Sequence, residues 1–284
     1  MKLSSLLRGK SILVAALAAG VALSGCASTQ SSEDVDAVYD PIEPVNRYVF
    51  EVNYFLDEMF IKPSAYIYRA ALPDPAQRGV RNALSNLRMP WTAINDLLQG
   101  EFDRAATAGG RFAINSTFGL LGLFDVAADL GLANHEEDAG QTLAVWGLPE
   151  GPYIVLPIFG PSNARDTVGL VGDYFGDPVN IVARQYPDGD LFLIGRGLLT
   201  GVSTREQVIE VLDELQRNSV DYYATLRSVY RQRRQNEIRN GAPEDDRPRP
   251  SASPSDSQPV ATAPEAVGGP EATAPPPASA INNR

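Results

Sequence analysis

The stretch that most constrains the fold runs from Gly140 to Asp166 and reads GQTLAVWGLPEGPYIVLPIFGPSNARD. Proline removes a backbone donor and glycine permits positive φ, and both recur here every few residues, so the stretch cannot be a single helix. It is also too apolar for a solvated loop. Irregular backbone with apolar side chains must be buried in protein or line a cavity, because its polar groups need partners. We therefore expect a rigid, irregular segment, most simply a buried crossover within a helical core.

The N-terminus predicts export rather than structure. Lys2, Arg8 and Lys10 precede a short apolar run over residues 12–23, which is typical of a secretory signal and too short to span a bilayer. The run ends in Leu23-Ser-Gly-Cys26, which looks like a bacterial lipobox, with cleavage before Cys26 and acylation of that residue. The alternative is a signal peptide that happens to end in cysteine. We expect a signal peptide over residues 1–25, a lipidated tether over 26–39, and no internal disulfide, because Cys26 is the only cysteine.

The rest of the chain divides into a body and a tail. The formal net charge is −11, which argues against nucleic-acid binding. Residues 40–240 predict one mostly α-helical domain with irregular Gly/Pro-rich segments and no persuasive strand. Residues 241–284 are rich in Pro, Ala and Ser and hold no aromatic residue, so we expect a disordered tail.

Prolines and capping residues predict the helix boundaries. The first helix should start with Asp40 as its N-cap and end before Pro63, with a wide aromatic face. The face has the spacing of an ordinary core helix. Ser162 is expected to cap a helix from Asn163 to Tyr174. The remaining predicted helices cover residues 64–71, 75–87, 90–100, 101–116, 123–130, 204–216 and 219–238, with a polar loop at 134–138 and a turn at 186–190.

The sequence lacks the residues that several kinds of active site require. His135 is the only histidine, which excludes a multi-histidine metal site, and no lysine lies in a phosphate-binding loop motif. Gly160 to Ala164 resembles a nucleophile elbow, but a hydrolase would need Ser162, His135 and Asp166 to meet, and Ser162 is better explained as a cap. Glu136 to Asp138 predict a solvated acidic run. Arg231, Arg233 and Arg234 suit the C-terminal end of a helix dipole. We expect no catalytic residue, cofactor or metal.

A set of ordered motifs carries a family resemblance. They are DPIEPVNR at 40–47, NL through NDLLQG within 86–100, RFAINSTFG at 111–119, GLFDVA at 122–127, EDAGQTL at 137–143, WGLPEGPY at 146–153, and LPIFGPS at 156–162 followed by Arg165-Asp166. Over residues 40–234 the chain resembles the MlaA (VacJ) outer-membrane lipoproteins. It departs from the family pattern at Ala139, where an aromatic residue is usual, and at Tyr222, where proline is common. Both departures bear on local packing.

The resemblance implies retrograde phospholipid transport that preserves outer-membrane lipid asymmetry. Such proteins are described as a helical ring lying in the periplasmic leaflet of the outer membrane around an amphipathic channel. The ring is held by porin trimers, and it passes phospholipids from the outer leaflet to a soluble periplasmic carrier, MlaC. For this chain the resemblance implies an anchor through Cys26 and no bond made or broken. Two other functions remain open, a lipid-anchored structural adaptor for porins and a periplasmic Ser-dependent lipase or esterase.

Polar and aromatic residues within these motifs are candidates to line a lipid path, because a headgroup needs polar partners and a desolvated charge is costly. For each charged residue alone, a buried salt bridge or a helix cap is an equal explanation. The candidates are Arg47, Phe50, Asn53, Tyr54, Arg111, Asn115, Gln141, Trp146, Tyr153, Arg165, Asp166 and Asp173.

Overall fold

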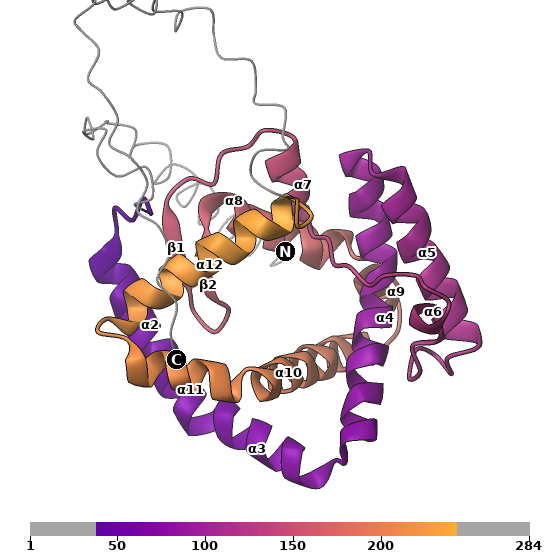
Figure 1. The fold of residues 1–284 in the computed structure, drawn as a ribbon, viewed down its shortest axis with the longest axis horizontal. Coiled ribbons are helices and arrows are strands. Elements are labelled where there is room, and N and C mark those ends of the chain that lie inside the picture. The colour runs from indigo at the N-terminus through magenta and orange to yellow at the C-terminus, as the bar shows by residue number, and fades with distance from the viewer. Residues whose placement is uncertain (1–37, 243–284) are drawn as a thin grey trace, which may run out of the picture. The chain divides into compact units, whose positions relative to one another are not determined.

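The computed structural model describes residues 38–242, which are mainly helical (Figure 1). The predicted signal peptide, Cys26, most of the tether and the tail from residue 243 lie outside the described residues. In chain order the elements are α2 (Glu43–Leu56), the π-helix η1 (Asp57–Ile61), α3 (Lys62–Ala71), α4 (Asp74–Gln99), α5 (Phe102–Thr117), α6 (Val126–Asp129), α7 (Ala139–Val145), β1 (Tyr153–Leu156), β2 (Gly160–Asn163), α8 (Ala164–Gly176), α9 (Pro178–Ala183), α10 (Gly189–Gln207), α11 (Ile209–Asn218) and α12 (Tyr222–Ile238).

The helices of the described residues follow one another around a ring (Figure 1). Helices α2, η1 and α3 lead into α4, which packs against α5, and α3 packs against α10. Helix α7 packs on α8, and α12 contacts both α7 and β2. The expectation of a ring-like, mostly helical domain is therefore confirmed.

The first predicted helix end, before Pro63, is wrong. Helix α2 passes through η1 directly into α3, in which Pro63 lies in the first turn. The wider π turn lets the N–H of Lys62 donate to the carbonyl of Asp57, five residues back. Pro63 donates no hydrogen bond within this continuous helical path, and the chain stays helical through the wider turn that precedes it.

The predicted role of Asp40 as an N-cap is also wrong. Helix α2 begins at Glu43 and its N-cap position makes no side-chain hydrogen bond. The carboxylate of Asp40 instead accepts hydrogen bonds from Asn46 at 2.8 Å and from Arg227 at 2.8 Å, and a third from the hydroxyl of Tyr223. Asp40 therefore fastens the start of the domain to α12.

The predicted break at Pro90 does not occur. Helix α4 runs from Asp74 to Gln99 with Pro90 inside it and ends where predicted, at Gly100, whose φ is +84°. An interior proline costs about 3 kcal/mol through a lost hydrogen bond and a ring clash. On either side of it Met89 and Trp91 are buried, and burying such side chains stabilises the helix by an amount of the same order.

The central Gly/Pro-rich stretch contains a β-hairpin, which the sequence reading missed. Strands β1 and β2 pair antiparallel, with Tyr153 opposite Asn163 and Leu156 opposite Gly160. Asn46 of α2 bonds the open edge: it donates to the carbonyl of Tyr153 at 2.9 Å and accepts from the N–H of Val155 at 2.9 Å.

Asn53, two turns further along α2, bonds the hairpin in the same way. It donates to the carbonyl of Leu156 at 2.8 Å and accepts from the N–H of Ile158 at 2.8 Å. The two asparagines thus take the place of a third strand. Alternation of apolar and polar residues does not reveal this hairpin in the sequence, because the partners of its edge strand are side chains of a helix rather than another strand.

Three other predicted boundaries move. Helix α8 is capped by Asn163, whose side chain accepts from the N–H of Asp166, rather than by Ser162. The helix predicted over 123–130 shortens to α6. The helix predicted over 204–216 is divided at Val208 between α10 and α11. The predicted turn at 186–190 is confirmed in its first part, because α10 already begins at Gly189.

Burial in the described residues is inverted relative to a water-soluble domain. The apolar cluster is small and consists of Phe50, Tyr153, Val155 and Tyr223. Most other fully buried large side chains are polar, whereas many large apolar side chains are exposed. The most exposed include Tyr48, Phe102, Phe118, Leu121, Ile158, Phe159 and Leu191. Among residues 38–242, no helix combines the length and the hydropathy that crossing a bilayer requires.

Candidate functional site

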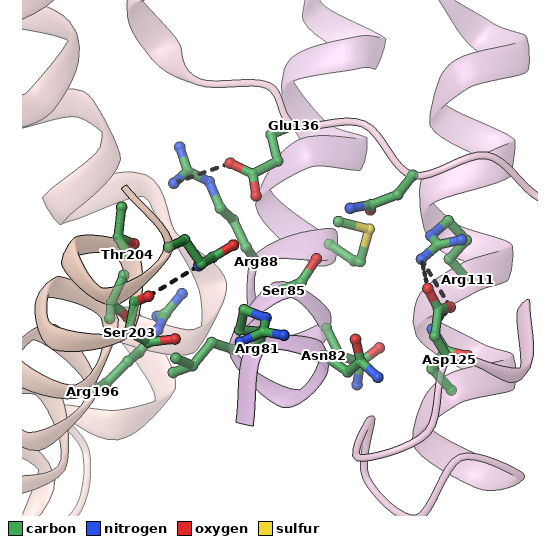
Figure 2. Close-up of a pocket in the computed structure, with 17 residues that line it drawn as sticks. Arg81, Asn82, Ser85, Arg88, Arg111, Asp125, Glu136, Arg196, Ser203 and Thr204 are labelled. Carbon is green, nitrogen blue, oxygen red and sulfur yellow. Dashed lines mark hydrogen bonds and ion pairs between the residues drawn. The ribbon is translucent and has the colours of Figure 1, made fainter. Parts of the chain in front are cut away.

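A polar cavity of 380 Å³ lies between α4, α5 and α10 (Figure 2). Most of its lining side chains carry a charge or a hydrogen-bonding group. They are Arg81, Asn82, Leu84, Ser85, Asn86, Arg88, Met89, Arg111, Asn115, Asp125, Asn134, Glu136, Arg196, Thr200, Ser203, Thr204 and Gln207.

The α5 wall of this cavity is closely paired, although the buried Nε of Arg111 has no hydrogen-bond partner in the described residues. Arg111 is buried and donates to both oxygens of Asp125, at 2.9 and 2.8 Å, and to the carbonyl of Leu132. One turn away, Asn115 donates to Asp125 at 2.9 Å and accepts from the N–H of Ala127. Burial by itself raises the pKa of Asp125, but its bonds to Arg111 and Asn115 outweigh burial and lower it. This wall is a rigid support that holds the turn before α6.

The α4 wall is loosely paired. Arg81, Ser85 and Arg88 follow one another at helical spacing, and Figure 2 shows them along the same stretch of α4. Arg81 has only a 3.7 Å contact with Glu206, which already accepts from Arg69, and Arg88 has only a 3.7 Å contact with Glu136. Both guanidinium groups are about one-third exposed. They can therefore take a ligand without losing a hydrogen bond.

Several buried polar atoms on the cavity wall have no partner. Asn86 is 3 % exposed with an unbonded Oδ1, and Ser203 is 2 % exposed with an unbonded Oγ. A buried polar group left unpaired costs about 1–3 kcal/mol. Partners supplied by a polar ligand or by water would recover that free energy.

A second cavity, of 500 Å³, adjoins the first, because Arg88 and Glu136 line both. It lies among α7, α8, α12 and the hairpin. Its lining is Arg88, Glu136, Asp138, Gln141, Leu156, Phe159, Pro161, Ser162, Asp166, Leu170, Asp173, Tyr230, Arg233, Arg234 and Glu237.

Arg234 is the centre of a buried ion network on this cavity, the Arg234 network. Its guanidinium donates to both oxygens of Asp138 at 2.7 Å and to Asp166 at 2.8 Å. Burial raises the pKa of Asp138, yet the hydrogen bonds and charge of Arg234 prevail and hold that pKa at about 2. Arg234 therefore joins the end of α12 to α8 and to the loop before α7. Its predicted role, as a positive charge suiting the helix dipole alone, is wrong.

The predicted solvated run at 136–138 is likewise wrong. Glu137 is 1 % exposed and accepts from Gln99 at 2.8 Å and from Arg104 at 2.6 Å. Only Glu136 of the three acids is largely exposed. The sequence could not distinguish the three, because the cations that pair with Glu137 and Asp138 come from other helices.

Gly140 fits beside the Arg234 network because it has no side chain. A Cβ at this position would lie 2.5 Å from a terminal nitrogen of Arg234 and 2.7 Å from an oxygen of Asp166. On the facing helix, a Cβ at Gly169 would lie 2.5 Å from the backbone nitrogen of Gly140. The two glycines let α7 and α8 approach closely enough for the network to form.

Asp173 lacks what its neighbours have. It accepts from the indole of Trp91 at 2.7 Å and from the N–H of Ala139 at 2.9 Å, but no cation in the described part of the chain pairs with it. Burial is the largest influence and raises its pKa. Gln141, 3 % exposed on the same cavity, has an unbonded Oε1. Here the second cavity presents unused acceptors.

The structure separates the residues predicted to line a lipid path into two groups. Arg111 and Asn115 lie on the first cavity, and Gln141, Asp166 and Asp173 on the second. The others line neither cavity and have partners elsewhere. Arg47 pairs with Glu43 and Asp221, Arg165 bonds Asp166, and Trp146 donates to the carbonyl of Leu98. Asn53 and Tyr153 belong to the contact between α2 and the hairpin, and Phe50 and Tyr54 pack on Tyr222. Contact of any of them with lipid stays a prediction.

Sequence reasoning missed the arginines of the open wall. Arg81 and Arg88 are seven residues apart with Ser85 between them, and Arg196, Thr200, Ser203 and Gln207 recur on α10 at three- and four-residue spacing. These two polar stripes were visible signals. They would have pointed to two helix faces meeting at one polar surface.

The residues of the hydrolase alternative have other partners. The Oγ of Ser162 is within 3.2 Å of the Thr167 hydroxyl, and His135 contacts Asp96 at 2.9 Å. Asp166 is committed to Arg234 and Tyr230. In the described structure these side chains do not form a nucleophile–base–acid chain.

A third cavity, of 630 Å³, differs from the first two in being lined almost wholly by apolar groups. Its lining comes from α4, α5, α9 and α10: Pro90, Phe112, Pro178, Val179, Val182, Ala183, Tyr186, Asp188, Gly189 and Phe192. The same helices thus border polar and apolar space.

Comparison with known proteins gives consistent matches. Residues 38–237 match the family described as MlaA lipoprotein. The intermembrane phospholipid transport system lipoprotein MlaA of Escherichia coli (strain K12) is 32% identical over 240 residues, covering 82% of this chain and 87% of that protein. The protein of the same name from Haemophilus influenzae is 32% identical over 244 residues, covering 83% and 93%.

One further relative and one solved structure extend these matches. A protein of Rickettsia bellii is 37% identical over 202 residues, covering 71% of this chain and 77% of its own length. A solved structure, described as the structural basis for maintenance of bacterial outer membrane lipid asymmetry, matches with a TM-score of 0.60 and 33% identity. It covers 70% of this chain and 98% of the solved chain.

Proposed function

Because this chain belongs to the MlaA lipoprotein family, we propose that it moves phospholipid between membranes and so maintains the lipid asymmetry of the outer membrane. The relatives named for intermembrane phospholipid transport are 32% identical over most of its length. It is an outer-membrane-associated lipoprotein of a transport family.

The inverted burial is the observation that carries this function. A phospholipid has a charged headgroup and apolar chains. A protein that conducts it must have polar surface in its interior and apolar surface on its exterior that can contact lipid. The two adjoining polar cavities supply the first requirement. The exposed apolar side chains of α2, α8 and α10, among them Tyr48, Phe175 and Leu191, suit the second. Helices with an apolar face can lie in a bilayer interface without spanning it.

Acyl chains need an apolar path beside the polar one. The cavity lined by Phe112, Val182 and Phe192 is bordered by α4, α5 and α10, which also border the first polar cavity. In the proposed transport the headgroup passes along the polar cavities while a chain rests against apolar surface of this kind. Transport then makes and breaks no covalent bond.

The finer parts of the function are proposals that follow from the family resemblance. The protein sits in the periplasmic leaflet, held by acyl chains on Cys26, and takes phospholipid that has strayed into the outer leaflet. It hands this lipid to a soluble periplasmic carrier, and porin trimers hold it in position. Two or more acyl chains make such an anchor stable, whereas one is marginal.

Outer-leaflet phospholipid tests this function directly. It is measured by labelling intact cells from which the gene has been deleted. The cells carry a plasmid that encodes the wild-type protein or Cys26→Ala, or an empty vector. Accumulation with the empty vector, cleared by wild type and not by Cys26→Ala, is the expected result. An unchanged outer leaflet in the empty-vector cells would contradict transport and favour the porin adaptor. A leaflet cleared equally by Cys26→Ala would contradict the anchor alone.

A further inference from the structure

Arg88 and Glu136 form the one pair of opposite charges that lines both the first and the second cavity described above. Their closest approach is 3.7 Å, beyond hydrogen-bond distance, and their side chains are 38% and 53% exposed (Figure 2). Neither side chain has another hydrogen bond or ion pair in the described residues. The pair is held by charge attraction without a hydrogen bond, and each member can exchange its partner at little cost.

The two sides of this pair differ in chemistry. On the first cavity, most groups without a close partner are donors: Arg81, with its 3.7 Å contact, the Nε of Arg111 and the buried hydroxyl of Ser203. The Oδ1 of Asn86 is an unbonded acceptor on the same cavity. On the second cavity the corresponding groups are acceptors: the carboxylate of Asp173, which has hydrogen bonds but no ion pair in the described residues, and the unbonded Oε1 of Gln141. Donors therefore continue beyond Arg88 and acceptors continue beyond Glu136.

We propose that the Arg88–Glu136 pair selects phospholipids whose headgroup carries both a phosphate and an ammonium group. This inference rests on the proposed transport function and specifies the substrate class. The phosphate takes Glu136's place beside Arg88, with Arg81 and Ser203 as further donors. The ammonium group takes Arg88's place beside Glu136, with Asp173 and Gln141 as further acceptors.

Charge balance is the physical reason for the preference. A headgroup with both charges, entering between Arg88 and Glu136, leaves each of them paired. A headgroup with a phosphate and only hydroxyl groups separates the pair and leaves Glu136 without a cation, beside the already unpaired Asp173. An unpaired charge in a partly enclosed site is costly.

Water-soluble headgroups test the selection without acyl chains. The probes are glycerophosphoethanolamine, glycerophosphoglycerol and inorganic phosphate, titrated calorimetrically against the full acylated chain in detergent. Wild type is expected to bind glycerophosphoethanolamine about threefold to tenfold more tightly than the other two, the range of a partly exposed charged contact. Glu136→Gln is expected to bind glycerophosphoethanolamine and glycerophosphoglycerol equally, while Arg88→Gln weakens both.

A matched control removes one carboxylate elsewhere. Glu214 is exposed on α11 and lines none of the three cavities. Glu214→Gln is expected to keep the wild-type preference. Circular dichroism checks that each variant is folded.

Three results would overturn the selection. They are equal binding of the two glycerophosphodiesters by wild type, a preference retained by Glu136→Gln, and inorganic phosphate bound as tightly as glycerophosphoethanolamine. The last would mark a site for free phosphate rather than for a headgroup.

Cells separate this inference from the transport function. Clearance of phosphatidylethanolamine and phosphatidylglycerol from the outer leaflet is followed separately. Glu136→Gln is expected to slow the first relative to the second by about threefold to tenfold while total clearance continues. Suppose that cells without the gene lose all clearance, and that wild type and Glu136→Gln clear phosphatidylethanolamine and phosphatidylglycerol in the same ratio. That result would contradict the selection and leave the transport function standing. No change in clearance without the gene would sink transport.

Discussion

The Arg234 network and the Arg88–Glu136 pair face the same cavity and use the same charged groups in opposite ways. Arg234 is 11% exposed and reaches two carboxylates at 2.7–2.8 Å. Arg88 is 38% exposed and reaches one carboxylate at 3.7 Å. Short bonds in a buried site hold elements together, whereas a long contact in an open site leaves both charges available. The difference separates residues that build the cavity from residues that can bind within it.

Replacing Arg234 should produce the largest effect and would break the closed side of this comparison. Arg234→Met leaves Asp138 and Asp166 as buried carboxylates without their principal cation. Removing one partner of a buried pair costs about 3–5 kcal/mol of unfolding free energy. Denaturant unfolding of the detergent-solubilised protein measures the loss.

A neighbouring arginine supplies the control for that experiment. Arg233 lies on the same helix but is 77% exposed and pairs with Glu237 one turn away. Arg233→Met is expected to change the unfolding free energy by less than about 0.5 kcal/mol. Equal losses in the two variants would show that the Arg234 network does not carry the stability assigned to it.

Acid should weaken the Arg234 network next, through Asp138. Its pKa is 3.8 in an unfolded chain and about 2 in the folded protein. A carboxylate with a lowered folded pKa contributes stability that is present above the unfolded pKa and lost as pH falls through the folded pKa. Protonation of Asp138 should therefore lower the unfolding free energy by about 2 kcal/mol between pH 4 and pH 2.

The difference between wild type and Asp138→Asn isolates that contribution. The gap in unfolding free energy between the two proteins should narrow steadily across pH 4 to 2 and be constant above pH 5. A gap that stays constant down to pH 2 would mean that Arg234 does not lower the pKa of Asp138. Unfolding titrations at half-unit pH intervals resolve the two outcomes.

The smallest effect on stability is expected on the open side. Arg88→Gln removes one member of a half-exposed contact and should change the unfolding free energy by less than about 0.5 kcal/mol. The same variant should slow clearance of outer-leaflet phospholipid, because Arg88 lines both cavities and its one ion pair, with Glu136, is long. A loss of several kcal/mol would place Arg88 among the structural residues and remove the contrast with Arg234.

Local signals in the sequence predicted much of the helical structure. The end of α4 at Gly100 follows from a glycine that adopts positive φ, and its start at Asp74 follows from Pro75 in the first turn. Both depend on only a few neighbouring residues. The predictions that were wrong at Pro63 and Pro90 share another cause, since distant packing and a π turn offset the local cost of proline.

The candidate site was only partly predictable for a similar reason. Arg111 and Asn115 were identified because they fall within a family motif, and they do line the first cavity. Arg81 and Arg88 were overlooked, since a single arginine on a polar helix face resembles any solvated residue. Their distinction is the absence of a close partner, and only the positions of α10 and of the loop at 132–138 reveal it.

The sequence by itself determined the helical class, the family and most of the helix ends, because these depend on composition, on short motifs and on interactions within a few residues. Only the tertiary structure decided which charges are saturated and which are open. Arg234 lies 96 residues from Asp138 and 68 from Asp166, and Asn46 lies more than a hundred residues from the hairpin that it completes. No local pattern encodes such pairs, since the strength of an ion pair or hydrogen bond depends on the burial and distance that the whole fold creates.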